Sequence, residues 1–179
     1  MIEAGYFPKI VEPATPAMGV PGVKEICSVS LCISSGPDDW VEKWRHNWLG
    51  WFNSPDDAWF VVPEAERHRY RLFAYRLGPT RYRKGEALAA IVPEDVKPVP
   101  IGGSFISLGF DAVNRSMESI LGFECSPLSC NGMAEEIPAN ECCLLPTREQ
   151  AEAAARQFSI DEPEPGEYFV VEVLEHQRA

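Results

Sequence analysis

The alternation of apolar and polar residues along the chain predicts a β-sheet. Two of the expected strands, 69–77 and 167–175, are apolar on both faces, which indicates interior positions in the sheet. In a third, 105–113, Gly109 interrupts the alternation and indicates a bulge or a close backbone approach. The full set of expected strands is 25–34, 69–77, 105–113, 141–145 and 167–175.

Helical periodicity predicts two main helices. In the segment 37–52, tryptophans recur at helical spacing after Pro37 and two aspartates, which favour a helix start. The segment 147–158 begins with a Thr147-x-x-Gln150 capping box and presents small apolar residues on one face. A shorter helix is expected after Pro55, because the same start signal recurs there.

These elements predict a single compact α+β domain, with a mainly antiparallel or mixed sheet of about five strands and two main helices packed on it. A chain of 179 residues is long enough for one sizeable core. Four prolines fall within residues 1–24, so an extended N-terminal arm is expected there, followed by the domain over residues 25–179.

The charge distribution limits the possible partners. The net charge is −11, and residues 104–179 carry fourteen acidic but only four basic side chains. Residues 42–84 carry the opposite excess, so the simplest interpretation is that the two halves neutralise each other. An acidic surface repels phosphates, so we expect no nucleic-acid binding. The sharper hypothesis is that the acidic C-terminal half meets a protein partner.

The sequence offers no signal for membrane insertion or export. No apolar run approaches the ~20 residues that a spanning helix needs, and the N-terminus lacks the apolar stretch of a secretory signal. We therefore expect a cytoplasmic protein without a membrane contact. In that compartment the six cysteines are expected as reduced thiols or metal ligands.

Residues 104–145 depart most from an ordinary core pattern, and the loop 124–132 lies within them. This loop combines hydroxyls and thiols with an Asn-Gly turn signal. Arg115, isolated among acidic residues, is most simply an ion-pair hub and alternatively an anion anchor. The candidate binding residues are Asp111, Arg115, Glu124, Ser126, Ser129 and Asn131.

The cysteines of this stretch permit two kinds of chemistry. Cys125 or Cys130 is a candidate nucleophile at a turn, but the sequence does not locate the base that it needs. Zinc ligation is the other possibility, with Cys125, Cys130, Cys142 and Cys143 as the weak candidate ligands. Their spacing matches the usual zinc knuckles poorly, so buried packing thiols, with no metal and no cofactor, are favoured. Cys27 and Cys32 are also expected to pack, on opposite faces of a strand.

The function favoured by these observations is a small binding or protein-interaction module that acts through its acidic C-terminal half and the loop 124–132. The alternative is a cysteine-dependent enzyme with its nucleophile in the same loop and with Arg115 and Glu124 positioning the substrate. The sequence leaves open whether the protein is an enzyme.

Overall fold

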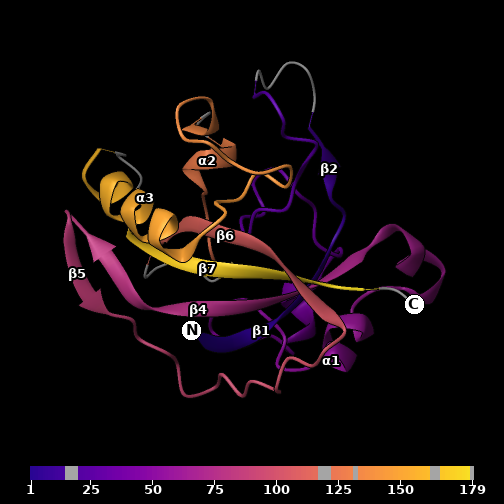
Figure 1. Ribbon diagram of the computed structural model, residues 1–179. Helices are drawn as coiled ribbons and strands as arrows, with labels where there is room; N and C mark the ends of the chain where they lie inside the picture. The colour runs from indigo at the N-terminus through magenta and orange to yellow at the C-terminus, as the bar shows by residue number, and fades with distance from the viewer. Residues whose placement is uncertain (15–19, 117–121, 131–132, 162–165, 178–179) are drawn as a thin grey trace.

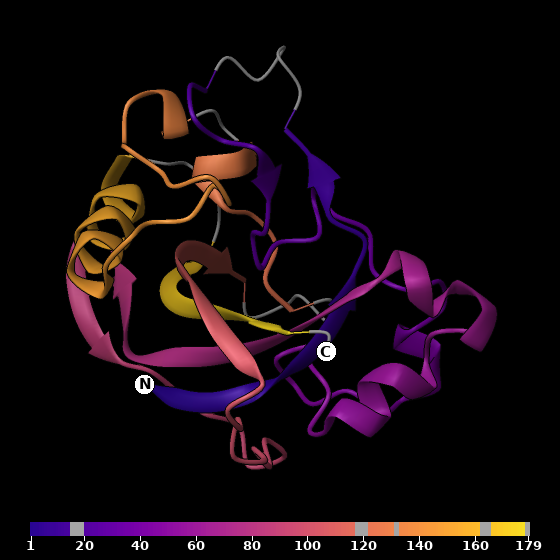
Figure 2. The same cartoon turned by 45° about the vertical axis from the view of Figure 1, so that its right-hand side comes forward.

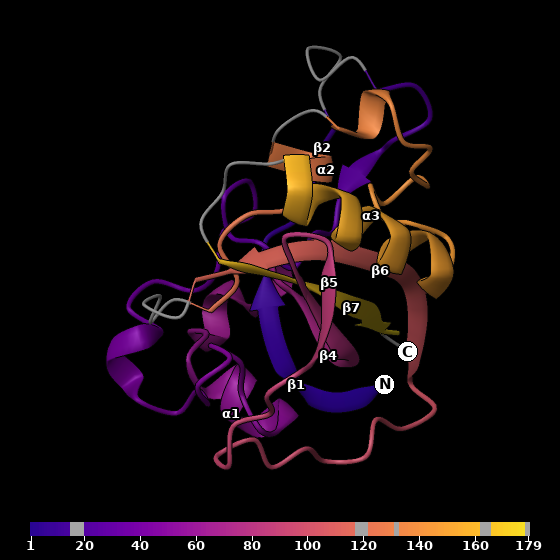
Figure 3. The same ribbon diagram turned by 90° about the vertical axis from the view of Figure 1, so that its left-hand side faces the viewer.

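A curved antiparallel sheet organises the molecule. The computed structural model describes residues 1–14, 20–116, 122–130, 133–161 and 166–177. Four strands lie in the order β1-β4-β7-β6, and β5 pairs with the far end of β4. Figure 1 shows the sheet running across the centre of the molecule, and Figure 3 shows its curvature. The strands are β1 (Ile2–Lys9), β4 (Arg71–Arg83), β5 (Glu86–Ala89), β6 (Phe105–Arg115) and β7 (Glu167–His176).

The predicted interior strands are confirmed. β7 lies between β4 and β6, and β4 lies between β1 and β7. Their side chains are buried on both faces, as the continuous apolar runs indicated. On β7, for example, Val171 and Val173 belong to one core and Tyr168 and Val170 to a second core on the other face. The α+β fold class predicted from the sequence is therefore confirmed.

The helix α3 (Arg148–Asp161) covers the second core. It packs on β6 and β7, as Figure 3 shows, and it buries three alanines together with Phe158. The predicted capping box is present: the N–H of Gln150 donates to Thr147 Oγ1, while the N–H of Thr147 donates to Gln150 Oε1. The predicted short helix is α1 (Pro55–Phe60), which is capped by Ser54. Within the described ranges, no helix is long and apolar enough to cross a membrane.

The helix predicted over 37–52 is wrong. Only a short 3-10 turn, η2 (Val41–Lys43), forms there, and Trp44 follows it in the left-handed region with a φ of 52°. Asn47 then accepts hydrogen bonds from the N–H groups of Leu49 and Trp51 through Oδ1. A side chain that bonds the local backbone in this way competes with the helix. A second 3-10 turn, η3 (Glu64–Arg69), precedes β4.

Two predicted strands are mostly loops. In the segment 25–34, only β3 (Glu25–Ile26) is a strand, and it pairs with β2 (Glu12–Pro13). Figure 2 shows this pair on the same side of the sheet as α2 (Pro127–Cys130). The segment 141–145 is a turn with one bridge to β6, because Asn140 Oδ1 accepts from two backbone N–H groups there. A 3-10 turn, η4 (Met133–Glu135), follows α2.

The N-terminal residues contribute to the sheet. Residues 1–24 are predicted as an extended arm, and their first part is β1, which pairs with β4 from Ile2 to Lys9. Most side chains of β1 are buried. The start of the chain is thus part of the domain core, and it brings Lys9 beneath the segment that carries Cys27 and Cys32.

Candidate thiol site

The segment 27–34 is held over the sheet by a buried lysine. Lys9 is 1% exposed, and its Nζ donates hydrogen bonds to the carbonyl oxygens of Ser28, Val29 and Ser30, the last two at 3.1 and 2.8 Å. Burial lowers the pKa of Lys9 to about 7, although Asp111 and nearby cysteines act in the opposite direction. The lysine side chain thus supplies the hydrogen-bond donors that a neighbouring strand would otherwise give to these three consecutive carbonyl groups.

A buried carboxylate joins this segment to the predicted loop. Asp111 on β6 is fully buried, and its Oδ2 accepts from Ser28 Oγ and from the N–H of Val29, both at 2.8 Å. Its Oδ1 accepts from Ser126 Oγ at 2.6 Å. Asp111 was predicted as a binding residue. In the structure it instead connects two chain segments that are almost 100 residues apart.

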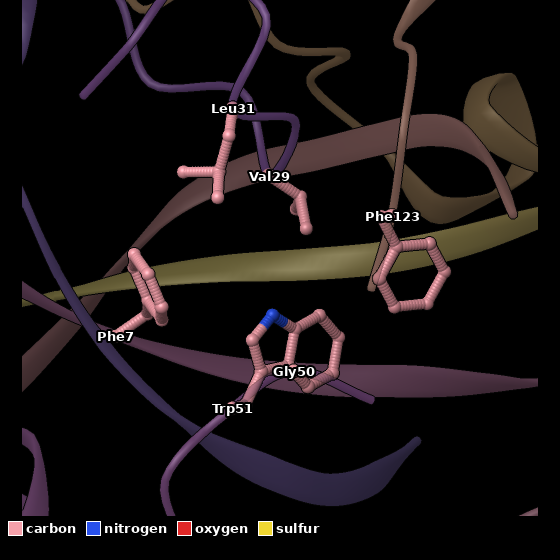
Figure 4. A pocket seen from close by; sticks show the side chains of 6 residues that line it. All are labelled: Phe7, Val29, Leu31, Gly50, Trp51 and Phe123. Carbon is pink, nitrogen blue, oxygen red and sulfur yellow. The ribbon is translucent and has the colours of Figure 1, made fainter. Parts of the chain in front are cut away.

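Apolar packing anchors the other side of the same segment. Val29 and Leu31 lie over the aromatic rings of Phe7, Trp51 and Phe123, as Figure 4 shows. The hollow between them has a volume of only about 10 Å³. That is about the space of one water molecule, so the segment fits closely on the core.

Three thiols converge where the two segments meet. The Sγ atoms of Cys32, Cys125 and Cys130 all lie within 4.8 Å of one another, and we call them the Cys32 cluster. Cys130 is the last residue of α2, and Cys125 precedes this helix. Cys32 is exposed, whereas Cys125 is buried and Cys130 is half-buried. The Cys32 thiol also donates to the carbonyl oxygen of Glu124 at 2.8 Å.

Hydrogen bonds favour a thiolate at Cys130. They lower the pKa of Cys130 to about 6, the largest contribution coming from the Cys125 thiol, while burial opposes the shift. The backbone of Ser126 and the hydroxyls of Ser129 and Ser30 act in the same direction. Burial raises the pKa of Cys32. These surroundings favour a thiolate at Cys130 over one at Cys32.

The other three cysteines lie apart from this cluster. Cys142 lies beside Cys27 and Glu25, with the two Sγ atoms and a carboxylate oxygen within 4.8 Å of one another. Cys143 is buried with its thiol against the carbonyl oxygen of Leu128, and burial raises its pKa to about 12. The set predicted for zinc, Cys125, Cys130, Cys142 and Cys143, is thus divided by the fold, because adjacent residues at the 141–145 turn enter different surroundings.

The structure shows Cys32 as a member of the site that the sequence reasoning missed. Cys27 and Cys32 were predicted as packing residues of one strand, but the strand ends at Ile26, and Cys32 is exposed. One signal was available in the spacing. The chain contains two C-x4-C pairs, Cys27–Cys32 and Cys125–Cys130. The repeated spacing draws attention to Cys32, although its partner in the spacing, Cys27, lies at the other thiol site.

The remaining predicted binding residues have various environments. Arg115 forms no ion pair with any described residue; its Nη2 donates to the carbonyl oxygen of Trp48, and burial lowers its pKa. Glu124 accepts from Ser116 Oγ at 3.1 Å through its carboxylate. Ser129 is buried beside Cys130, at 3.8 Å from Oγ to Sγ. Asn131 lies outside the described residues.

No histidine is hydrogen-bonded to a thiol in the described part of the chain. His46 lies between the rings of Trp40 and Trp44, and His176 lies against Phe105. A larger hollow of about 340 Å³ adjoins His46 and the exposed Trp44 and Trp48, and no cysteine lines it. The base that a cysteine nucleophile needs is therefore not supplied by a histidine hydrogen-bonded to a thiol among the described residues.

Part of the acidic C-terminal half is paired inside the protein. Three arginines on β4 form ion pairs with three glutamates on β7, which agrees with the simpler interpretation of the charge asymmetry. The pairs are Arg71–Glu175, Arg76–Glu172 and Arg81–Glu167.

No protein-family model, no curated protein and no solved structure matches this chain.

Proposed function

We propose that the protein is a binding module whose loop 124–132, together with Cys32, holds a thiophilic metal ion. Zn²⁺ is the reference case, because thiolates are among its preferred ligands. The observation that carries the proposal is the convergence of three Sγ atoms from two distant segments. Such a convergence is more specific than the sequence spacing, which by itself favoured packing thiols.

The separation of the sulfur atoms suits an ion. Because the three Sγ atoms are at most 4.8 Å apart, an ion equidistant from them would lie at most about 2.8 Å from each. Zinc–sulfur bonds are about 2.3 Å long, so an inward movement of roughly half an ångström per side chain would form them. Rotation of the exposed Cys32 side chain is the least restricted of these movements.

The protonation state also favours a metal. A thiol must lose its proton to ligate, so protons compete with the ion. The lowered pKa of Cys130 reduces this competition for one of the three ligands. The three thiolates would leave the fourth tetrahedral position to water or to a group from a bound molecule, as in zinc sites that exchange ligands.

The expected protein partner is compatible with this proposal. A partner that supplies the fourth ligand would bind at the loop 124–132, next to the exposed Cys32. Binding of a partner through the acidic C-terminal half remains a prediction. The ion pairs between β4 and β7 already neutralise part of the acidic charge that suggested it. A basic partner would bind less tightly as the salt concentration rises.

The second candidate function is a cysteine-dependent enzyme, and the lowered pKa of Cys130 is the observation that favours it. A thiolate next to two thiols is suited to attack on a disulfide or another soft electrophile. Hydrolysis would also need a base, and no histidine is hydrogen-bonded to a thiol in the resolved ranges. The metal proposal requires all three cysteines, whereas a nucleophile requires Cys130 above all.

Zinc affinity tests the proposal. The reduced, metal-free protein is titrated with Zn²⁺ at pH 7.5 against a chromophoric chelator, and the bound metal is counted by elemental analysis. We expect one ion per chain. Each single replacement by serine, at Cys32, Cys125 or Cys130, should weaken zinc binding by at least about 100-fold. That is more than the loss of a residue that only hydrogen-bonds a metal ligand.

The control variant is Cys143→Ala, which removes a thiol from the same region but from outside the Cys32 cluster. It should bind zinc like the native protein, and thermal unfolding of the metal-free variants should confirm that each is folded. The proposal is refuted if the native protein takes up no zinc, or if the three serine variants retain its affinity.

A further inference from the structure

The Cys27–Cys142 pair is a second thiol site, separate from the Cys32 cluster. The N–H of Cys27 donates to the carbonyl oxygen of Cys142 at 3.0 Å, and the N–H groups of Lys24 and Glu25 both donate to that of Glu141. The segment 24–27 therefore lies beside residues 141–142. Cys27 is 1% exposed and Cys142 is 7% exposed.

The charges around the pair disfavour a metal ion there. Glu25 is the third potential ligand, but its two oxygens accept hydrogen bonds from Arg71 at 2.6 and 2.9 Å. Arg71 also bonds Glu175. A divalent ion would have to displace a guanidinium from its carboxylate and would then gain only two sulfur ligands. Arg71 holds this carboxylate, whose Oε1 also accepts from the thiols of Cys27 and Cys142, at 3.4 and 3.7 Å.

We propose that Cys27 and Cys142 form a reversible disulfide, so that this pair is a redox modification site. The hydrogen bond from the N–H of Cys27 to the carbonyl oxygen of Cys142 places the two main chains side by side, and opposite residues of a hydrogen-bonded antiparallel pair have Cα atoms about 5.5 Å apart. Disulfides span Cα separations of about 4.4–6.8 Å, so the main chains need little movement. The two sulfur atoms lie within 4.8 Å of each other and close to about 2.0 Å on bond formation.

The reaction balances with a small-molecule disulfide as the oxidant. The Cys142 thiolate attacks one sulfur of the oxidant, and a mixed disulfide forms while one thiolate leaves. Cys27 then loses its proton and attacks Cys142 Sγ, which expels the second thiolate. The pair loses two electrons and two protons, and the oxidant becomes two thiols.

Cys142 is the first to react in this sequence. It is the more exposed of the two, and a hydrogen bond from the Cys27 thiol lowers its pKa, whereas the pKa of Cys27 is raised. The closed bond would fasten the segment that leads to Cys32 to the turn after Asn140. It would join residues 115 positions apart. A cross-link that closes so long a loop lowers the conformational entropy of the unfolded chain strongly and so stabilises the folded state.

The site is tested on the full-length protein by disulfide mapping. The folded, reduced chain is incubated at pH 7.5 with excess oxidised glutathione, its remaining thiols are blocked, and its peptides are mapped by mass spectrometry without reduction. We expect a peptide that joins Cys27 to Cys142 and that disappears on reduction. The same bond should form in a variant with serine at positions 32, 125 and 130, which removes the competing thiols.

Cys27→Ser is the matched control, and in it Cys142 should stop at the mixed disulfide with glutathione. The cross-linked protein should unfold at a higher urea concentration than the reduced protein. The inference is overturned if Cys27 and Cys142 remain alkylatable after denaturation, or if Cys142 pairs only with another cysteine. It does not depend on zinc binding, because the triple serine variant lacks the Cys32 cluster and still tests it.

Discussion

Replacement of Asp111 by alanine should loosen the connection between the two halves of the candidate site. The carboxylate accepts three hydrogen bonds, two from the segment 27–34 and one from Ser126. It is one of the contacts that hold these two segments together; Ser30 Oγ and the Cys32 thiol also donate to the carbonyl oxygen of Glu124. Alanine removes all three acceptor contacts and leaves the N–H of Val29 buried without its partner.

The magnitude follows from the burial of these groups. A hydrogen bond to a charged group contributes about 1.5–3 kcal/mol, and removing one member of a buried charged network costs about 3–5 kcal/mol. The hydroxyls of Ser28 and Ser126 can rotate to other acceptors, so the three hydrogen bonds should contribute less than three times the value of one. We therefore expect Asp111→Ala to lower the free energy of unfolding by about 3–5 kcal/mol. Asparagine retains one acceptor oxygen and the shape of the side chain, so Asp111→Asn should lose only about 1–2 kcal/mol.

Urea unfolding of the reduced protein measures the stability, and zinc affinity measures the site. Asp111→Ala should weaken zinc binding at least about tenfold, as the loss of an outer-shell partner does, while Asp111→Asn keeps most of it. Asp38→Ala removes an exposed carboxylate and serves as the control, with an expected change within about 0.5 kcal/mol. The reasoning fails if Asp111→Ala costs less than about 1 kcal/mol and leaves the zinc affinity unchanged.

Three further predictions concern the bulge, the thiolate and the pH dependence of stability. Gly109 has a φ of +137°, and an added Cβ would lie 2.8 Å from the carbonyl oxygen of Leu145. Gly109→Ala should therefore lower the free energy of unfolding by about 2–4 kcal/mol, measured in urea. Gly102 has open space around it, so Gly102→Ala should change the free energy of unfolding little. Alkylation of Cys130 in the native protein should reach half its maximal rate near pH 6, and a midpoint above pH 8 would contradict the thiolate. The free energy of unfolding should rise between pH 7 and 8.5, because Lys9 and Cys130 are largely deprotonated in the folded state there while both still hold protons in the unfolded chain. Each group contributes up to about 1.4 kcal/mol per pH unit. Cys130→Ser should reduce this slope, and a flat profile would argue against the lowered pKa values of both groups.

The elements that the sequence predicts correctly are those whose own residues determine them. β4 and β7 are long apolar runs that only an interior strand can bury on both faces, and α3 begins at a capping box. The segment 37–52 has helical periodicity, but Asn47 and the left-handed Trp44 produce turns instead. Periodicity does not distinguish these outcomes, because the deciding hydrogen bonds involve single side chains.

The candidate site could be predicted only in part for a similar reason. The sequence indicates the loop 124–132 and its two cysteines as unusual, and both belong to the Cys32 cluster. Cys32 could not be added from periodicity, because its position depends on Lys9 and Asp111, which come from β1 and β6. Those contacts span up to 83 positions of the chain, and no local pattern encodes them.

The buried charges beneath the site are a further argument that it has a function. Lys9 and Asp111 are both almost fully buried, yet they do not form an ion pair with each other in the described structure. Each instead uses its hydrogen bonds on the backbone and hydroxyls of the segments that carry Cys32 and Cys130. Well-packed apolar residues in such positions are often as stabilising as buried ions or more so, which makes stability alone a weak reason for the arrangement. Proteins depart from apolar packing chiefly at functional or strained sites, and here the departure lies directly under the three convergent thiols.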